Sequence, residues 1–158
     1  MWMPTWVPSA RRRRSRLLTL APQDNGGGGF RLTAEDTVDF VNKVLVAEAR
    51  PLKLAVGLKN AGAVVPSVLS AVQFSVNEQC AEYDECATYT PFIDAGKPVF
   101  HIEYPSGAGD RNPVGTASVC KKDGEGTDLS RFSTVIKKLN LDGWVEYCNG
   151  LVVATEVN

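Results

Sequence analysis

Hydrophobic residues recur at regular spacing from about residue 33, and the period changes from helical to extended several times along the chain. In residues 33–49, Thr33 is a candidate N-cap, acidic residues occupy the first turn, and apolar residues then recur on one helical face. That face consists of Val38, Val41, Leu45 and Ala49. The pattern predicts a helix of about four turns.

Four short runs further along are rich in apolar and β-branched residues, which is typical of strands. The predicted strands span residues 52–58, 72–77, 98–103 and 143–147. Helical segments are expected between the strands at 64–72 and at 84–96, the second broken at Pro91 and closed by Gly96. A long loop is expected at 105–127, followed by a third helix at 128–140. The inward face of this helix consists of Phe132, Val135, Ile136 and Leu139. Helices that alternate with strands predict an α/β fold with a parallel sheet and right-handed crossovers.

Polar residues follow the predicted strands at the point where each strand ends. Lys59 and Asn60 end the first strand, Glu78 ends the second within the stretch SVNEQC, and Glu103 ends the third. Parallel α/β folds build their active sites at the carboxyl ends of the strands. These four side chains are therefore predicted to face one cleft.

Each of these candidates also has a purely structural interpretation. Glu78 is equally consistent with a loop glutamate that accepts from Lys59, and Glu103 with a strand-end salt bridge. His101, the only histidine, fits a packed or hydrogen-bonded residue better than a metal ligand, since too few further ligands accompany it. Trp144 is a candidate platform for a sugar ring, although a tryptophan in a short strand more often belongs to the core.

Carboxylates at a strand-end cleft, with an aromatic residue nearby and no metal ligands, favour glycoside hydrolysis. That reaction needs one protonated carboxyl to expel the leaving oxygen and one ionised carboxylate to attack or to activate water. Glu146, on the last predicted strand, is a further acidic candidate. The residues imply no cofactor and no metal.

Composition and charge limit the class of protein. The chain has 158 residues, of which 44% are hydrophobic and 22% charged, as expected for one globular domain. Residues 1–23 contain five arginines and no lysine or acidic residue, so the remainder is net acidic, which argues against nucleic acid as a partner. We interpret residues 1–23 as a poorly ordered tail and residues 24–158 as the folded domain. No apolar run reaches the ~20 residues of a membrane span, and none has the length expected of a signal peptide.

The four cysteines, Cys80, Cys86, Cys120 and Cys148, lack the paired C-x-x-C spacing of zinc sites. Cys80 and Cys86 are close enough to pair around the loop AEYDE, which leaves Cys120 and Cys148 for a second bridge. Two bridges indicate an oxidising compartment. Four reduced thiols in a cytosolic protein are the alternative.

Several long motifs resemble the fungal branch of glycoside hydrolase family 114: GLKNAG, QFSVNEQCAEYDEC, TYTPFIDAGKPVFHIEYP and FSTVIKKLNLDGWVEYC. The resemblance covers about residues 24–149 and implies the C-terminal half of a (β/α)8 TIM barrel. It also implies an extracellular or cell-surface location and endo-α-1,4-polygalactosaminidase or α-galactosidase activity on a galactosamine-containing polysaccharide. Glu78 corresponds to one catalytic acid of the family, and we expect substrate binding from Lys59, Asn60, Asn77, Glu103, Trp144 and Glu146.

One catalytic motif of the family has no counterpart in this sequence. The resemblance implies a second acid, an aspartate in a D-P-D-N motif upstream of the glycine-rich loop, but that region reads RRRRSRLLTL. Residues 1–23 do not resemble the family. A truncated, non-catalytic remnant or a carbohydrate-binding fragment is therefore the alternative to an active hydrolase.

Overall fold

The computed structural model describes residues 32–109 and 117–156. The chain divides into two compact units between Phe74 and Ser75, and each unit is described by itself. The predictions for residues 1–23 and for the glycine-rich loop that follows lie outside the described residues. Within the described ranges, no helix combines the length and the apolar composition needed to cross a membrane.

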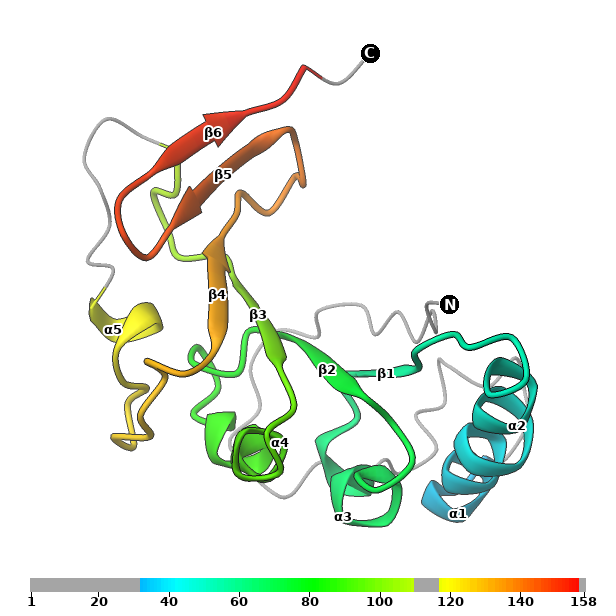
Figure 1. Ribbon diagram of the computed structural model, residues 1–158. Coiled ribbons are helices and arrows are strands. Elements are labelled where there is room, and N and C mark those ends of the chain that lie inside the picture. Colours follow the sequence, from blue (N-terminus) through cyan, green and yellow to red (C-terminus); the bar gives the residue numbers. More distant parts are fainter. Residues whose placement is uncertain (1–31, 110–116, 157–158) are drawn as a thin grey trace. The chain divides into compact units, whose positions relative to one another are not determined.

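The first unit opens with one continuous helical stretch, which confirms the predicted helix (Figure 1). It consists of α1 (Ala34–Asp39), a π-helical segment (Phe40–Leu45) and α2 (Val46–Ala49). Thr33 starts it with a capping box, in which the backbone amides of Thr33 and Asp36 each donate to the other residue's side chain. Val41, Leu45 and Ala49 are buried as predicted, Val38 is half-buried, and Val46 joins the buried set.

The predicted strand at 52–58 is wrong over most of its length. Leu52 and Leu54 are 67% and 47% exposed, and β1 is confined to Gly57–Lys59. The amides of Leu52 and Leu54 donate to the carbonyl of Ala49, so these residues form the turn that closes the preceding helix. The short helix predicted next is confirmed as a 3-10 turn (Gly62–Val64) followed by α3 (Val65–Val68).

A mixed sheet organises the second unit. Its strands are β2 (Phe74–Glu78), which begins at the unit boundary, β3 (Val99–Glu103), β4 (Ser133–Ile136), β5 (Trp144–Tyr147) and β6 (Val152–Ala154). β2, β3 and β4 run parallel to one another, whereas β5 is antiparallel to β4 and β6 to β5 (Figure 1).

Two helices interrupt the strands of the second unit. A 3-10 turn (Cys86–Tyr89) leads into α4 (Thr90–Asp94), and α5 spans Ala117–Cys120. Pro91 lies in the first turn of α4, where its missing amide is not needed, so it starts the helix instead of breaking it. Gly96, with a φ of 70°, follows the helix end as expected.

The helix predicted at 128–140 is wrong, because residues 133–136 form β4. Thr134, Val135 and Ile136 are consecutive β-branched residues, which favour extended backbone. Burial alternates along the strand, and Leu139, expected to face inward, is 72% exposed. The position of β5 is correct, but its parallel direction is wrong. The chain between β4 and β5 is shorter than the dozen or so residues that a parallel crossover needs, so β5 returns antiparallel.

Gly143 provides a test of the hairpin packing. The amide of Thr155 donates to the carbonyl of Gly143 over 2.9 Å, and a Cβ on Gly143 would overlap the carbonyl oxygen of Thr155. We expect Gly143→Ala to lower the free energy of unfolding by about 1–3 kcal/mol in urea denaturation. It should also accelerate hydrogen exchange at the Thr155 amide. Gly150→Ala separates backbone strain from overlap, because the φ of 82° at Gly150 disfavours alanine although its Cβ would meet no atom within 4 Å. Equal exchange at Thr155 in both variants would contradict this packing.

Candidate functional site

The parallel strands present two faces that differ in burial. Side chains alternate between the faces of a strand, and residues paired across neighbouring strands share a face. The buried face carries Ser75, Asn77, Val99, His101, Glu103, Thr134 and Ile136, all of them buried. The open face carries Val76, Glu78, Phe100, Ile102, Ser133 and Val135, of which Val76 is buried and the rest are half-buried or exposed.

Glu78 and Glu103 lie on opposite faces of this sheet. Glu78 pairs with Ile102, so Glu103 is one residue out of phase with it. Glu78 is half-buried on the open face, whereas Glu103 is 2% exposed on the buried face. The expectation that both carboxylates face one cleft therefore does not match their positions.

Asn77 also lies on the buried face, at 3% exposure. Lys59 and Asn60 belong to the first unit, where Lys59 ends β1 and both residues are half-buried. Asn60 and the following Ala61 have φ angles of 51° and 53°, so the backbone turns sharply at this strand end. The expectation that Lys59 and Asn60 face one cleft with Glu78 stays a prediction.

Tyr104 is a neighbour of Glu78 that the sequence analysis missed. It follows directly after β3 and is half-buried. Burial raises its pKa to about 12, and the negative charges of Glu78 and Glu103 add to the effect. At neutral pH its hydroxyl therefore keeps its proton and can donate a hydrogen bond. In the sequence, Tyr104 directly follows Glu103 at a predicted strand end, and this position could have marked it as a candidate site residue.

Three successive backbone amides after Glu78 are held by three different acceptors. Gln79 donates to the carbonyl of Ile102 over 2.9 Å, and Cys80 donates to the Asn77 side-chain oxygen over 3.2 Å. Ala81 donates to Glu103 Oε1 over 2.7 Å. Gln79 itself has a φ of 64°, a left-handed conformation that costs a non-glycine residue about 1–2 kcal/mol. These bonds hold the turn in that conformation.

His101 connects the loop to β4 through buried hydrogen bonds. The Nε2 atom of His101 lies 2.6 Å from Glu103 Oε1, and its Nδ1 atom lies 3.0 Å from Thr134 Oγ1. His101 is fully buried, and its ring meets the ring of Phe132 edge-on at a centroid distance of 5.8 Å. The interpretation of His101 as a hydrogen-bonded structural residue is confirmed.

Both predicted disulfides are present. Cys80 bonds to Cys86 and Cys120 to Cys148, with Cα–Cα distances of 4.8 Å and 5.6 Å. Potential ligand atoms of Cys80, Cys86 and His101 lie within 4.8 Å of one another, which is the spacing of a metal site. The two sulfur atoms are bonded to each other, however, and offer no thiolate to a metal.

Trp144 and Glu146 occupy β5, away from the parallel strands' open face. Trp144 is half-buried, and Lys138 Nζ lies 5.7 Å from the centroid of its ring, a cation–π contact. Glu146 is 9% exposed and pairs with Ile136, so it continues the buried face. Among the strands of the described residues, Glu78 is thus the carboxylate that the open face carries.

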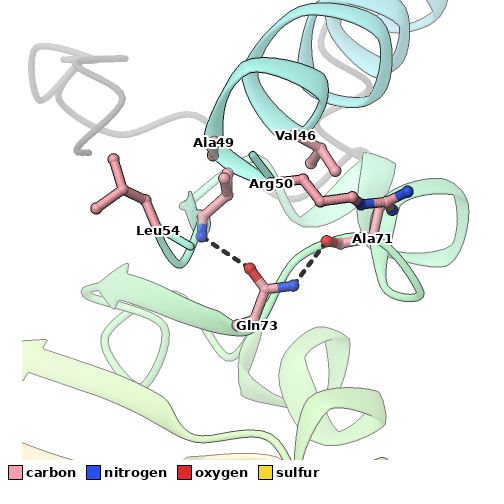
Figure 2. A pocket seen from close by; sticks show the side chains of 7 residues that line it. Val46, Ala49, Arg50, Leu54, Ala71 and Gln73 are labelled. Carbon is pink, nitrogen blue, oxygen red and sulfur yellow. Dashed lines mark hydrogen bonds between the residues drawn. The ribbon is translucent and has the colours of Figure 1, made fainter. Parts of the chain in front are cut away.

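A small pocket lies in the first unit, between the end of the helix and the segments at 54–56 and 71–73 (Figure 2). It is lined by Val46, Ala49, Arg50, Leu54, Val56, Ala71 and Gln73. Gln73 spans its floor, accepting from the amide of Val56 and donating to the carbonyl of Ala71. Its volume of about 170 Å³ is below that of ordinary ligand sites, and it contains no carboxylate.

A parallel sheet with an acid at a strand end is the arrangement found in α/β glycoside hydrolases. The model of Glycoside-hydrolase family GH114 matches residues 21–153, and the chain belongs to this family. The family predicted from the sequence motifs is therefore confirmed. A comparison with curated proteins gave no match.

Among solved structures, the chain is similar to a crystal structure of Aspergillus fumigatus Ega3 in complex with galactosamine. The two sequences are 44% identical and the TM-score is 0.66. The match covers 81% of this chain and 51% of the Ega3 chain, so this chain spans about half the length of that relative. The similarity confirms the predicted fold class, a part of a TIM-barrel glycoside hydrolase.

The ionisation of Tyr104 tests its proximity to Glu78. We expect Glu78→Gln to lower the Tyr104 pKa below about 12, but not to the ordinary value, because burial, the largest cause, remains. The measurement is a tyrosinate absorbance titration, with Tyr104→Phe to identify the signal. Glu125→Gln, an exposed acid, should leave the pKa unchanged. An unaltered Tyr104 pKa in Glu78→Gln would show that the two groups are not neighbours.

The same pKa predicts how stability depends on pH. The folded-state pKa of Tyr104 exceeds the unfolded value of about 10, so the folded chain binds more protons between these two pH values. Stability is therefore lost as the pH rises from about 10 to about 12. Tyr104→Phe should weaken this dependence, as measured by urea denaturation at several pH values.

Proposed function

We propose that this chain contributes Glu78 as a catalytic carboxylate to a glycoside hydrolase that cleaves α-1,4-galactosaminidic bonds in a galactosamine-containing polysaccharide. The observation that carries the proposal is a half-buried acid on the open face, at the carboxyl end of a parallel strand, inside the GH114 match. The 44% identity with Ega3, a structure that contains galactosamine, supports the choice of sugar.

Glu78 has the surroundings expected of a glycosidase acid. Its strand is fixed by the parallel ladder to β3, and the residues after it are held by hydrogen bonds and a disulfide, so its position is defined before substrate binds. Tyr104 adds a protonated hydroxyl close by, suited to binding a sugar oxygen or the carboxylate itself. Lys59 and Asn60, at the end of β1, are proposed as further substrate contacts.

Hydrolysis needs a second carboxyl, at ~5–5.5 Å from the first in retaining enzymes or ~6.5–9.5 Å in inverting ones. Glu103 and Glu146 are poor candidates, because both belong to the buried face. The sequence contains no D-P-D-N motif. We therefore propose that the second acid belongs to the part of the catalytic domain that corresponds to the unmatched portion of Ega3.

The second candidate function is carbohydrate binding without hydrolysis. It is favoured by the single carboxylate on the open face of the described strands. In both cases we propose an extracellular or cell-surface location, which the two disulfides support because such bonds persist in oxidising compartments.

Product release from α-1,4-galactosamine oligomers, acetylated and de-N-acetylated, distinguishes the two functions. We expect no measurable hydrolysis by the 158-residue chain alone, because one carboxylate cannot serve as both acid and nucleophile. Joining the chain to the part of Ega3 that it does not match should restore hydrolysis. Products would be identified by mass spectrometry.

Variants of the joined protein test the role of Glu78. Glu78→Gln should reduce kcat on the order of 10³-fold or more, as expected for loss of a catalytic group. Glu125→Gln, at an exposed position, should leave kcat unchanged. If the isolated chain hydrolyses the oligomers and Glu78→Gln abolishes this hydrolysis, a second acid within the chain completes the site. Oligomer binding without turnover in the joined protein would favour the carbohydrate-binding function.

A further inference from the structure

We infer that Glu103 is a positioning residue: through the hydrogen-bonded contacts Thr134–His101–Glu103–Ala81 it fixes the turn that follows Glu78. The inference deepens the proposed function and rests on it for the identity of the catalytic acid. It replaces the interpretation of Glu103 as a substrate contact, since its carboxylate is 2% exposed and belongs to the buried face.

The hydrogen bonds of Glu103 define its role. One oxygen, Oε1, lies 2.7 Å from the Ala81 amide and 2.6 Å from His101 Nε2. The amide can only donate, so this oxygen accepts from it. The same oxygen has a lone pair left for a second bond, which His101 donates in its Nε2–H tautomer. Nδ1 of His101 then faces the Thr134 hydroxyl at 3.0 Å, which ties the ring to β4.

The turn that Glu103 holds needs external support. Gln79 has a φ of 64°, which is unfavourable for a residue with a Cβ, and such strain persists only where the surroundings over-determine it. The amides of residues 79 and 80 are held by a strand carbonyl and by Asn77, and the bond from Ala81 to Glu103, at 2.7 Å, is the shortest of the three. The Cys80–Cys86 bridge closes the loop but does not hold the Ala81 amide.

Glu103 is thus separated from the reacting side of the sheet but coupled to it through the backbone. Only Gln79 and Cys80 stand between Glu78 and the amide that Glu103 binds. Displacement of Ala81 would release the left-handed turn at Gln79 and with it the end of β2. The side chain of Glu78 would then lose its fixed orientation on the open face.

The first test measures hydrogen exchange in the 158-residue chain by NMR and needs no activity. We expect Glu103→Leu to accelerate exchange at the Ala81 amide about tenfold or more, the effect of losing one hydrogen bond to a buried side chain. Glu103→Gln should preserve most of the protection, because its side-chain oxygen still accepts. Glu146→Leu removes another buried strand carboxylate and should leave the exchange of residues 79–81 unchanged relative to the rest of the sheet.

His101 supplies a spectroscopic readout, because it is the only histidine in the chain. We expect a bonded Nε2 proton in the wild type, retained in Glu103→Gln and shifted or lost in Glu103→Leu. Unchanged Ala81 exchange and an unchanged imidazole signal in Glu103→Leu would overturn the inference, whatever the outcome of the hydrolysis assay.

The second test uses kcat of the protein joined to the unmatched part of Ega3. A positioning role predicts that Glu103→Gln keeps most of kcat while Glu103→Leu loses it about tenfold or more, on the scale of one buried hydrogen bond. If Glu103→Gln instead lowers kcat as much as Glu78→Gln does, Glu103 is a reacting carboxylate and the inference fails. Because the exchange and imidazole measurements require no turnover, failure of the proposed hydrolysis is distinguishable from failure of this inference.

Discussion

The strict alternation of side chains along paired strands is the constraint on which this site depends. Because β2 and β3 are in register at Glu78 and Ile102, every second residue of both strands points to the same face. The acids at their ends therefore fall on different sides and have different roles. Glu78 lies on the open face, whereas Glu103 is enclosed with His101 and Thr134 beneath the strand ends.

Burial of a charged group is costly unless its hydrogen bonds are satisfied, and the buried face meets that condition. Glu103 accepts from the Ala81 amide and is hydrogen-bonded to His101, His101 uses both ring nitrogens, and Asn77 accepts from the amide of Cys80. Such a network has few alternative arrangements, because a shift of any member leaves a buried polar group unpaired. The network provides rigidity at the end of β2, where a glycosidase needs a carboxylate at a fixed distance from its substrate.

The sequence was informative where local periodicity and spacing determine the structure. The helix after Thr33, the positions of β2 and β3, and both cysteine pairings follow from patterns within a few residues or from simple counting. The helix predicted at 128–140 was wrong. The spacing of Phe132, Val135 and Ile136 fits a helix, but the run of β-branched residues and the pairing with β3 favour a strand.

The candidate site was predicted only in part, for a related reason. The ends of the strands were recognised correctly, but the face on which each acid lies depends on the register between strands, which no single strand reveals. Glu103 was therefore assigned to the cleft. Tyr104 was missed because its proximity to Glu78 arises only when β2 and β3 lie side by side.

The Cys120–Cys148 bridge joins the end of α5 to the residue after β5. It closes a covalent ring that contains β4, the strand to which His101 is tied, and β5. A single backbone cleavage anywhere between these two cysteines would leave both pieces linked. Nicked protein would still migrate as one species until it is reduced, so a single band on a non-reducing gel is no proof that the chain is continuous through β4.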